Sequence, residues 1–320
     1  MTVWLEFEKP VLELEQRIAD LREHSAELGV GAEQEIAELE RKAEGMRRDL
    51  YANLSRYQRV QIARHPKRPY SLDYIRTCFT GFEELHGDRH FADDPAIVAG
   101  MAWLDHRPVM VIGQQKGRDT KENLLRRFGM PNPEGYRKAL RLMQLADRFR
   151  VPIVTLVDTP GAYPGLGAEE RGQAEAIAVN LREMATFGVP IVTVVIGEGG
   201  SGGALAIAVA DRVLMFEHSV YSVISPEGCA SILWRDGKQG AKAAEALRLA
   251  APDLQHLGIV DGVLPEPFGG AHRDPAAAAT TLKAALAENL DALAGVSPSD
   301  LMAQRAAKFR KLGVFRDTTA

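Results

Sequence analysis

The chain has 320 residues, of which 46% are hydrophobic and 26% are charged. These fractions are typical of globular proteins, and they exclude a disordered, a collagen-like or a highly charged chain. Because 39 Lys and Arg residues stand against 43 Asp and Glu residues, the net charge is −4. No overall electrostatic attraction to nucleic acid or to an anionic membrane is therefore expected.

The cysteines and the apolar runs exclude further classes of protein. Cys78 and Cys229 are too few for a disulfide framework or a zinc-ligand set, and they suit a reducing compartment. The first residues lack the pattern of a signal peptide, and the longest apolar run, 204–210, is much shorter than a membrane span. We expect a cytoplasmic protein without a cysteine-bound metal.

Residues 1–64 are expected to form an N-terminal helical hairpin. The apolar residues recur three and four positions apart, which gives each helix one apolar stripe; they are Val11, Leu14, Ile18 and Leu21, and then Ile36, Leu39, Met46, Leu50 and Leu54. The sequence Gly29-Val30-Gly31 marks the turn between the helices. The stripe could pack within the chain or against another subunit. Residues 65–69 contain two prolines and are expected to be a linker.

Residues 70–302 alternate short apolar runs with helical stretches, which predicts an α/β domain. Two strands are expected at 97–103 and 108–112, joined by a turn. The sequence of 149–157 recurs at 187–195, and each copy is preceded by a helical segment and followed by a glycine-rich loop. Such a repeat predicts parallel strands with both loops at the same end of the sheet. Residues 303–320 are expected to be a charged tail.

The second loop, Gly197 to Gly203, holds five glycines in seven residues and precedes an apolar helix expected at 204–210. Glycines at a helix N-terminus expose N–H donors to an anionic ligand, although a tight packing turn would also use glycine. The spacing of Gly197, Gly199 and Gly202 matches a dinucleotide fingerprint. The loop also matches a nucleophile elbow with Ser201 as nucleophile, for which the candidate bases are His218, His256 and His272.

The first loop, Asp158 to Gly167, is expected to face the second across one crevice. Glu169 and Glu170 follow it at the start of a helix, where acidic residues usually offset the helix dipole. A segment between Lys116 and Arg150 contains ten basic and four acidic residues. It could attract a phosphate-bearing ligand or an acidic carrier domain, or it could be a solvated helix face.

Four segments together resemble a known family: 157–165, 169–173, 197–206 and 221–230. They are closely similar to the α subunit of bacterial acetyl-coenzyme A carboxylase carboxyltransferase. The resemblance extends from the N-terminal helices to about Arg273, and it weakens from about Ala303. It implies a crotonase-like (ClpP/crotonase) superhelix of ββα units, and a reaction in which a carboxyl group passes from carrier-bound biotin to acetyl-CoA, giving malonyl-CoA for fatty acid synthesis.

The resemblance also implies site residues. Gly202 and Gly203 match the position of the backbone N–H donors that stabilise the oxyanion of carboxybiotin. The residues expected to form the crevice walls are Gly161, Ala162, Gly165, Gly199, Gly200 and Ser201. No metal site is expected on this chain.

The implied partners are a β subunit, the biotin carboxyl carrier protein and biotin carboxylase. The β subunit is expected to form an α2β2 assembly with this chain and to carry the zinc. Carboxybiotin and acetyl-CoA would be substrates, with no cofactor bound covalently to this chain, no membrane and no required nucleic acid. Two alternatives stay open: a crotonase-like serine hydrolase that uses Ser201, and a noncatalytic scaffold whose hairpin binds partners.

Overall fold

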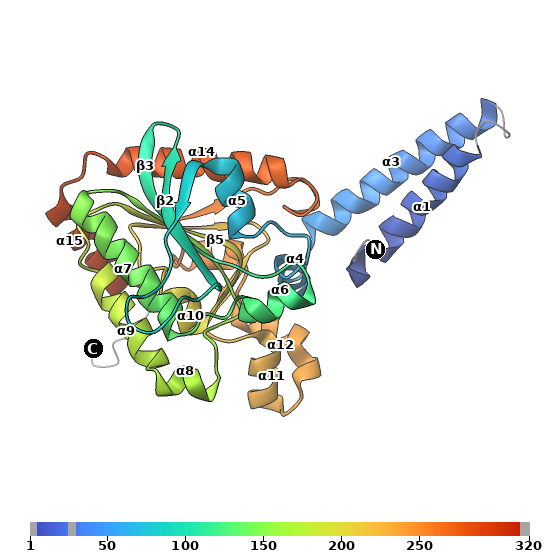
Figure 1. Ribbon diagram of the computed structural model, residues 1–320. Coiled ribbons are helices and arrows are strands. Elements are labelled where there is room, and N and C mark those ends of the chain that lie inside the picture. Colours follow the sequence, from blue (N-terminus) through green and yellow to red (C-terminus); the bar gives the residue numbers. More distant parts are fainter. Residues whose placement is uncertain (1–4, 25–29, 314–320) are drawn as a thin grey trace, which may run out of the picture.

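The computed structural model describes residues 5–24 and 30–313. It has two parts, an α/β body and an arm of two antiparallel helices that projects from the body (Figure 1). The arm consists of α1 (Lys9–Glu23) and α3 (Val30–Ala52). Gly29, in the expected turn, lies outside the described residues, while Val30 and Gly31 already belong to α3.

Among the described residues, the body is built on one mixed sheet of eight strands, with the order β1-β2-β3-β4-β5-β6-β8 and with β7 paired to β5. The strands are β1 (Thr80–Glu84), β2 (Ile97–Leu104), β3 (Arg107–Gln114), β4 (Ile153–Thr159), β5 (Ile191–Gly200), β6 (Arg212–Phe216), β7 (Val220–Ser222) and β8 (Gly262–Leu264). The first three strands are antiparallel, and all pairs from β3 onward are parallel.

Helices cover both faces of this sheet, as the alternation of strands and helices predicts. The longer helices of the body are α4 (Arg56–Ala63), α5 (Ser71–Cys78), α7 (Pro133–Phe149), α9 (Gln173–Met184), α11 (Pro226–Trp234), α12 (Gly240–Leu247), α14 (Pro275–Leu293) and α15 (Pro298–Arg310). Shorter helices are α6 (Thr120–Leu125), α8 (Leu166–Glu170), α10 (Ser201–Leu205), α13 (Ala251–His256), and the 3-10 turns η1 (Glu6–Glu8), η2 (Arg127–Gly129) and η3 (Gly237–Gln239).

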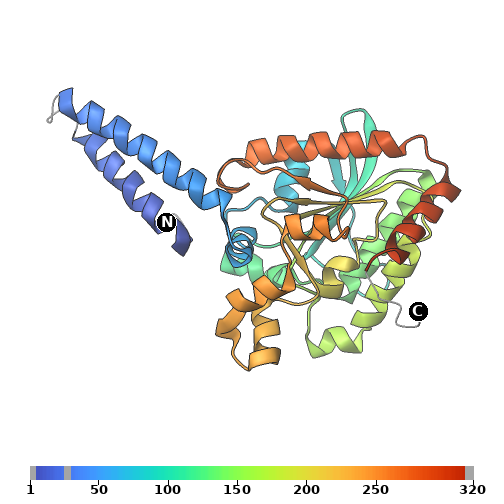
Figure 2. The same ribbon diagram turned by 180° about the vertical axis from the view of Figure 1, so that it is seen from behind.

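Alternate residues of the strands enter two separate cores. On one face Ile153 and Ile191 pack with side chains of α7 and α9. On the other face Val154 and Val192 pack with α5 and α14 (Figures 1 and 2). Because both faces are covered, the central strands are continuously apolar, which is how they appear in the sequence.

The sequence repeat is a repeat in the sheet. Ile153 pairs with Ile191 and Val157 with Val195, so the two copies lie next to each other in parallel and in register. Thr155 and Thr193 hold equivalent positions, and their hydroxyls are 2.6 Å apart inside the core.

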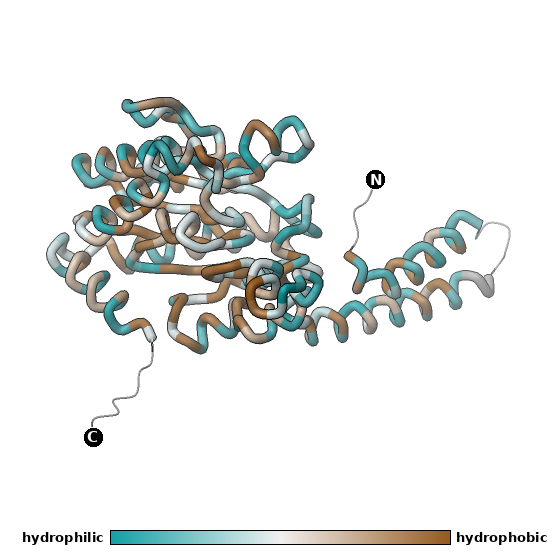
Figure 3. Tube along the Cα trace, turned by 90° about the horizontal axis from the view of Figure 1, so that it is seen from below, coloured by the Kyte–Doolittle hydropathy of each residue, from teal (hydrophilic) through white to brown (hydrophobic). Residues whose placement is uncertain are grey.

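The apolar stripe of the arm packs mainly inside the arm. Ile18 of α1 and Ile36 and Ala43 of α3 form a buried cluster, joined by Leu39. Apolar and polar residues alternate along both helices (Figure 3). Leu50 packs at the base, where the arm meets the body. The hairpin is also shorter than expected, because α4 is a separate helix that contacts β5 and α12.

Residues 65–69 do not form a loose linker. Arg68 is fully buried, donates from Nε to the Ile196 carbonyl oxygen at 2.7 Å, and pairs with the buried Glu266 at 2.7 Å. Both prolines lie beyond the end of α4, and Arg68 between them attaches the segment to β5.

The expected tail at 303–320 contains the second half of α15. Arg305 is buried, pairs with Asp211 at 2.8 Å, and donates to the carbonyl oxygens of Met184 and Phe187. The first part of the expected tail is therefore a packed helix, because its cation Arg305 is neutralised inside the body. Within the described ranges, no helix is long and apolar enough to cross a bilayer.

Candidate active site

The loops that follow β4 and β5 lie side by side at one end of the sheet. Thr159 pairs with Gly199 after an irregularity that shifts the register of the two repeated strands beyond Val157. Gly203 then lies directly against the backbone of Gly161 and Ala162, so closely that a side chain at 203 would overlap the Ala162 nitrogen. The two loops are adjacent, as the repeat predicts.

The helix after the second loop is shorter and begins earlier than expected. β5 continues to Gly200, and α10 covers only Ser201–Leu205 instead of 204–210. Ser201 has a φ of 54°, a left-handed conformation that turns the strand abruptly into the helix. The segment that follows α10 is buried but is formed by turns, since Ala208 donates to Leu205 only three residues back.

Most glycines of the two loops make room for neighbouring groups. The tight positions are Gly165 against the Tyr163 ring, Gly197 against the Asp158 carboxylate, Gly199 against the Tyr221 ring, Gly200 against the Pro160 carbonyl, and Gly203 against Ala162. Gly202 differs, because the nearest side-chain atom to a Cβ built there would be 3.7 Å away. Gly202 is thus the glycine of α10 at which a Cβ would make only ordinary van der Waals contacts.

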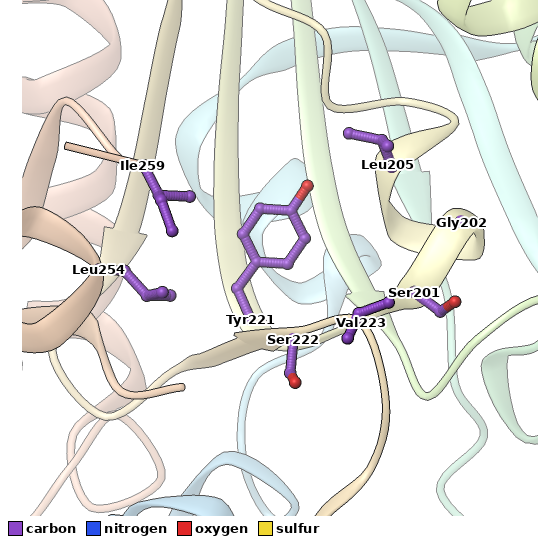
Figure 4. A pocket seen from close by; sticks show the side chains of 8 residues that line it. All are labelled: Ser201, Gly202, Leu205, Tyr221, Ser222, Val223, Leu254 and Ile259. Atoms are coloured by element: carbon purple, nitrogen blue, oxygen red, sulfur yellow. The ribbon is translucent and has the colours of Figure 1, made fainter. Parts of the chain in front are cut away.

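A cavity of about 270 Å³ opens beside α10. Its lining residues come from α10, from β7 and the residue after it, and from α13 and the loop after it; they are Ser201, Gly202, Leu205, Tyr221, Ser222, Val223, Leu254 and Ile259 (Figure 4). The walls are mostly apolar, so a ligand here would be largely removed from water, where hydrogen bonds and charges act more strongly.

The expected site residues divide into three groups. Ser201 and Gly202 line this cavity, whereas Gly199 and Gly200 line a much smaller one of about 20 Å³. Of the described residues, the remaining expected ones line neither of these two cavities; they are Gly161, Ala162, Gly165 and Gly203. The backbones of Gly161 and Ala162 pack against Gly203 of α10.

A buried ionic network lies under the two loops. Lys116, just after β3, is 2.7 Å from Asp158 at the end of β4 and 2.8 Å from Glu198 in β5. Arg64, directly after α4, also pairs with Glu198, at 2.8 Å, and with Glu227 of α11 at 3.0 Å. Burial alone would raise the pKa of Glu198, but the two cations outweigh burial and lower it to about 2. The network ties three strand ends and two helices together.

Sequence reasoning missed this network, although a signal for it exists. Lys116, Asp158 and Glu198 are charged residues at the carboxyl ends of three neighbouring apolar strands. Buried charges are rare unless they are paired, so three of them at one sheet end predict a mutual contact once the strand order is known.

The basic segment at 116–150 is largely neutralised within the chain. Its cations pair with acidic residues, mostly from 73–94: Arg118 with Asp73, Arg126 with Glu122, Arg127 with Asp94, Arg137 with Asp88, and Lys138 with Asp93. Lys138 is completely buried. The local charge is therefore mainly structural, and the idea that it attracts a ligand loses its main support.

The geometry does not fit a serine hydrolase. His218 is buried against Arg59 and the Tyr51 ring, and His272 stacks on His65 at 4.0 Å. No histidine lines the cavity, and within the described part of the chain the Ser201 hydroxyl has no hydrogen bond to a histidine. Gly197 and Gly199 lie within β5, so the dinucleotide fingerprint is also not realised as a loop.

Metal binding finds no support in the residues that the structure describes. Among them, no group of three or more His, Cys, Asp or Glu side chains is arranged to hold an ion. Cys78 is buried and Cys229 partly buried, and both are free thiols.

Comparisons with known proteins show the family of the chain. Residues 4–313 match the family model described as acetyl co-enzyme A carboxylase carboxyltransferase-like. The chain is 63% identical over 313 residues to the acetyl-coenzyme A carboxylase carboxyl transferase subunit α of Geobacter metallireducens, covering 98% of both chains. It is 59% identical to the subunit of the same name from Thermus thermophilus, covering 98% of this chain and 99% of the relative. The match continues past 303, where the sequence indicated little resemblance.

Solved structures share the fold at low sequence identity. A Pseudomonas malonate decarboxylase hetero-tetramer in complex with coenzyme A contains a chain with a TM-score of 0.59 and 19% identity, covering 75% of this chain and 96% of that one. Transcarboxylase 12S has a TM-score of 0.57 and 21% identity, covering 72% of this chain and 43% of that one. The body thus has the crotonase-like carboxyltransferase fold, and the chain belongs to the family of acetyl-coenzyme A carboxylase carboxyltransferase α subunits.

Proposed function

We propose that this chain is the α half of the carboxyltransferase component of acetyl-CoA carboxylase. It moves the carboxyl group of carboxybiotin, held on a carrier protein, to acetyl-CoA, and the malonyl-CoA formed enters fatty acid synthesis. The observation that carries the proposal is similarity to α subunits over nearly the whole chain. The cavity beside Gly202 supports it.

The reaction develops negative charge on two oxygens. When the bond between the ureido nitrogen and the carboxyl carbon breaks, its electron pair stays on the ureido group and CO₂ is released. The ureido nitrogen takes a proton from the acetyl methyl group, and the resulting enolate attacks CO₂ to form the new carbon–carbon bond. Stabilising each oxyanion requires fixed N–H donors in a site that excludes water.

In this proposal Gly202 supplies such a donor for the ureido oxygen. Gly202 lines the cavity and lies in the first turn of α10, where N–H groups have no partner within the helix. The N-cap residue Gly200 has no side chain to satisfy them. Gly203 is tightly packed on Ala162, so it contributes by holding α10 against the first loop as well as by its N–H group.

The second oxyanion site is assigned to a β subunit, in an α2β2 assembly. Exposed apolar side chains stand on the same end of the body as the cavity: Leu166 of α8, Val223, and Ile232 and Leu233 of α11, with exposures of 61% to 76%. Isolated apolar residues are normal on a surface, but several around one site are typical of an interaction surface. A facing subunit would cover them and close the cavity.

The remaining parts of the proposal follow from the same reaction. The biotin carboxyl carrier protein delivers carboxybiotin, biotin carboxylase recharges it, the β subunit holds the zinc, and the complex works in the cytoplasm. This chain then needs no cofactor attached to it.

The test is reconstitution. The purified chain alone is expected to give no malonyl-CoA from acetyl-CoA and carboxylated carrier, and adding the β subunit is expected to restore turnover and produce a complex with the mass of α2β2. Turnover by the chain alone would contradict the proposal. So would a mass measurement in which the chain forms no complex with the β subunit.

A further inference from the structure

Three of the side chains that line the cavity beside α10 carry hydroxyl groups: Ser201, Tyr221 and Ser222. Ser222 and Tyr221 are consecutive in β7 and leave it in opposite directions, and the Ser201 hydroxyl points away from the tyrosine (Figure 4). The Tyr221 ring rises from β7 toward α10, with its hydroxyl on the side of Leu205. Of the three hydroxyl groups, that of Tyr221 is therefore the one on the Leu205 side of the cavity.

The ring of Tyr221 is held in place by its surroundings. β7 pairs Tyr221 with Gly199 of β5, and the Tyr221 N–H donates to the Leu249 carbonyl oxygen at 3.0 Å. A Cβ at position 199 would lie only 2.7 Å from the ring, so the glycine leaves the space that the ring occupies. A side chain fixed in this way loses little freedom when a ligand binds, which favours binding.

The Tyr221 hydroxyl does not contribute a hydrogen bond to the described part of the fold. Within the described ranges no hydrogen-bond partner of the Tyr221 hydroxyl is present, although many other polar side chains here are paired. The hydroxyl of Tyr74 also lacks a partner, but Tyr74 is fully buried and stacks on Phe216 in the second core. Tyr221 differs because it lines an open cavity, where a ligand can reach it.

Burial raises the pKa of Tyr221 to about 12, so the phenol keeps its proton at neutral pH. It is then a hydrogen-bond donor, and a neutral one. A donor in an apolar pocket strengthens its bond to an oxygen as that oxygen becomes negative.

We propose that the Tyr221 hydroxyl donates a hydrogen bond to the ureido oxygen of biotin in this cavity and strengthens that bond as the carboxyl group leaves. The proton stays on the phenol throughout, so the step adds no proton transfer to the reaction. This inference rests on the proposed function and adds a side-chain donor to a site otherwise described by backbone groups.

The first experiment compares Tyr221→Phe with Tyr74→Phe in the complete α and β assembly. Both changes remove one unpaired phenol hydroxyl and keep the ring, so Tyr74→Phe is a matched control. We expect Tyr221→Phe to lower kcat for malonyl-CoA formation about tenfold or more with an unchanged KM for acetyl-CoA, since a lost oxyanion donor costs up to about 10²–10³ in rate. Tyr74→Phe is expected to stay within about twofold of the unchanged protein.

The second experiment needs no turnover. The complex is labelled with carbon-13 at the tyrosine Cζ atoms, the Tyr221 signal is assigned by its loss in Tyr221→Phe, and free biotin is added. The Tyr221 signal is expected to move with biotin, and the Tyr74 signal is expected to stay. An unmoved Tyr221 signal, or a kcat of Tyr221→Phe within twofold of the control, overturns the inference.

The two failures can be told apart. If the unchanged complex makes no malonyl-CoA, the proposed function is wrong. If it does make malonyl-CoA and Tyr221→Phe behaves as Tyr74→Phe does, only the role of Tyr221 is wrong.

Discussion

Gly202 and Gly203 are neighbours in α10, but Gly203 is packed much more tightly against other atoms than Gly202 is. A Cβ at 202 would have its nearest side-chain neighbour, Ile177, at 3.7 Å, whereas a Cβ at 203 would overlap the Ala162 nitrogen. A substitution of Gly202 should therefore affect mainly catalysis, and a substitution of Gly203 should affect mainly folding.

We expect Gly202→Val to lower carboxyl transfer by about 10²–10³-fold, because the side chain would obstruct the approach of a ligand to the N–H donors. The fold and the assembly with β should be intact, since a Cβ at this position would make only ordinary contacts with Ile177. Initial rates of malonyl-CoA formation and the thermal midpoint would be measured together. Near-normal turnover would contradict the role of Gly202.

Gly203→Ala is the contrasting change. Here the methyl group would displace the first loop, so we expect a lower thermal midpoint and a loss of activity that follows the loss of folded protein. A fully stable Gly203→Ala would mean that the loop can move away from α10 at little cost.

At the scale of elements, Lys116 holds three strand ends together. Lys116→Met would leave Asp158 and Glu198 buried without their shared cation, and removing one partner of a buried pair typically costs about 3–5 kcal/mol. Urea unfolding would measure that loss. Lys116→Arg keeps the positive charge and should therefore recover part of the lost stability. A purely steric role for the Lys116 side chain would not explain such a recovery.

The same network predicts a pH dependence. The pKa of Glu198 is lowered from 4.5 to about 2, so the folded state binds this proton less readily than the unfolded state does. Its contribution to stability is therefore complete above about pH 4.5 and is lost as the pH falls toward 2.

The check compares the unchanged protein with Glu198→Gln by urea unfolding at several pH values. The unchanged protein should lose stability between about pH 5 and 3, and the variant should show a weaker slope across that interval. Equal slopes would mean that Glu198 is not held ionised in the fold. Glu266, whose pKa is also lowered to about 2 by the neighbouring Arg68 despite its burial, and Asp93, whose pKa is lowered to about 2, contribute to the remaining slope.

At the scale of the whole molecule, the arm is joined to the body by a small polar and aromatic cluster. The Tyr51 hydroxyl donates to the buried Glu8 at 2.7 Å, and Arg273 of the body pairs with the same carboxylate at 2.9 Å. The Tyr51 ring lies against His218 and Phe268.

We expect Tyr51→Phe to loosen the base of the arm without affecting the sheet. It removes a hydrogen bond to a buried carboxylate, which is worth about 1.5–3 kcal/mol. Amide hydrogen exchange should become faster in η1 and α1, while β4 and β5 keep the protection of the unchanged protein. Faster exchange in the sheet as well would show that the arm and the body unfold as one unit.

The sequence by itself determined the α/β class, the adjacent repeated strands and the position of the two glycine loops. These features depend on local patterns, namely continuous apolar strands, glycines after them and a repeat of 38 residues between equivalent positions such as Ile153 and Ile191. The motifs also identified the family, because each is a continuous segment of the sequence that can be recognised before the fold is known.

Only the tertiary structure decided which charges are buried and which glycines are too tightly packed to carry a side chain. Arg68, Lys116 and Arg305 belong to charged stretches that the sequence indicated to be linker, basic surface and tail, and each is neutralised by an acid distant in the chain. The cavity has the same origin, since Gly202, Tyr221 and Leu254 come from three separate elements. Periodicity records only neighbours along the chain, whereas the desolvation of a charge and the space beside a glycine depend on which distant elements pack there.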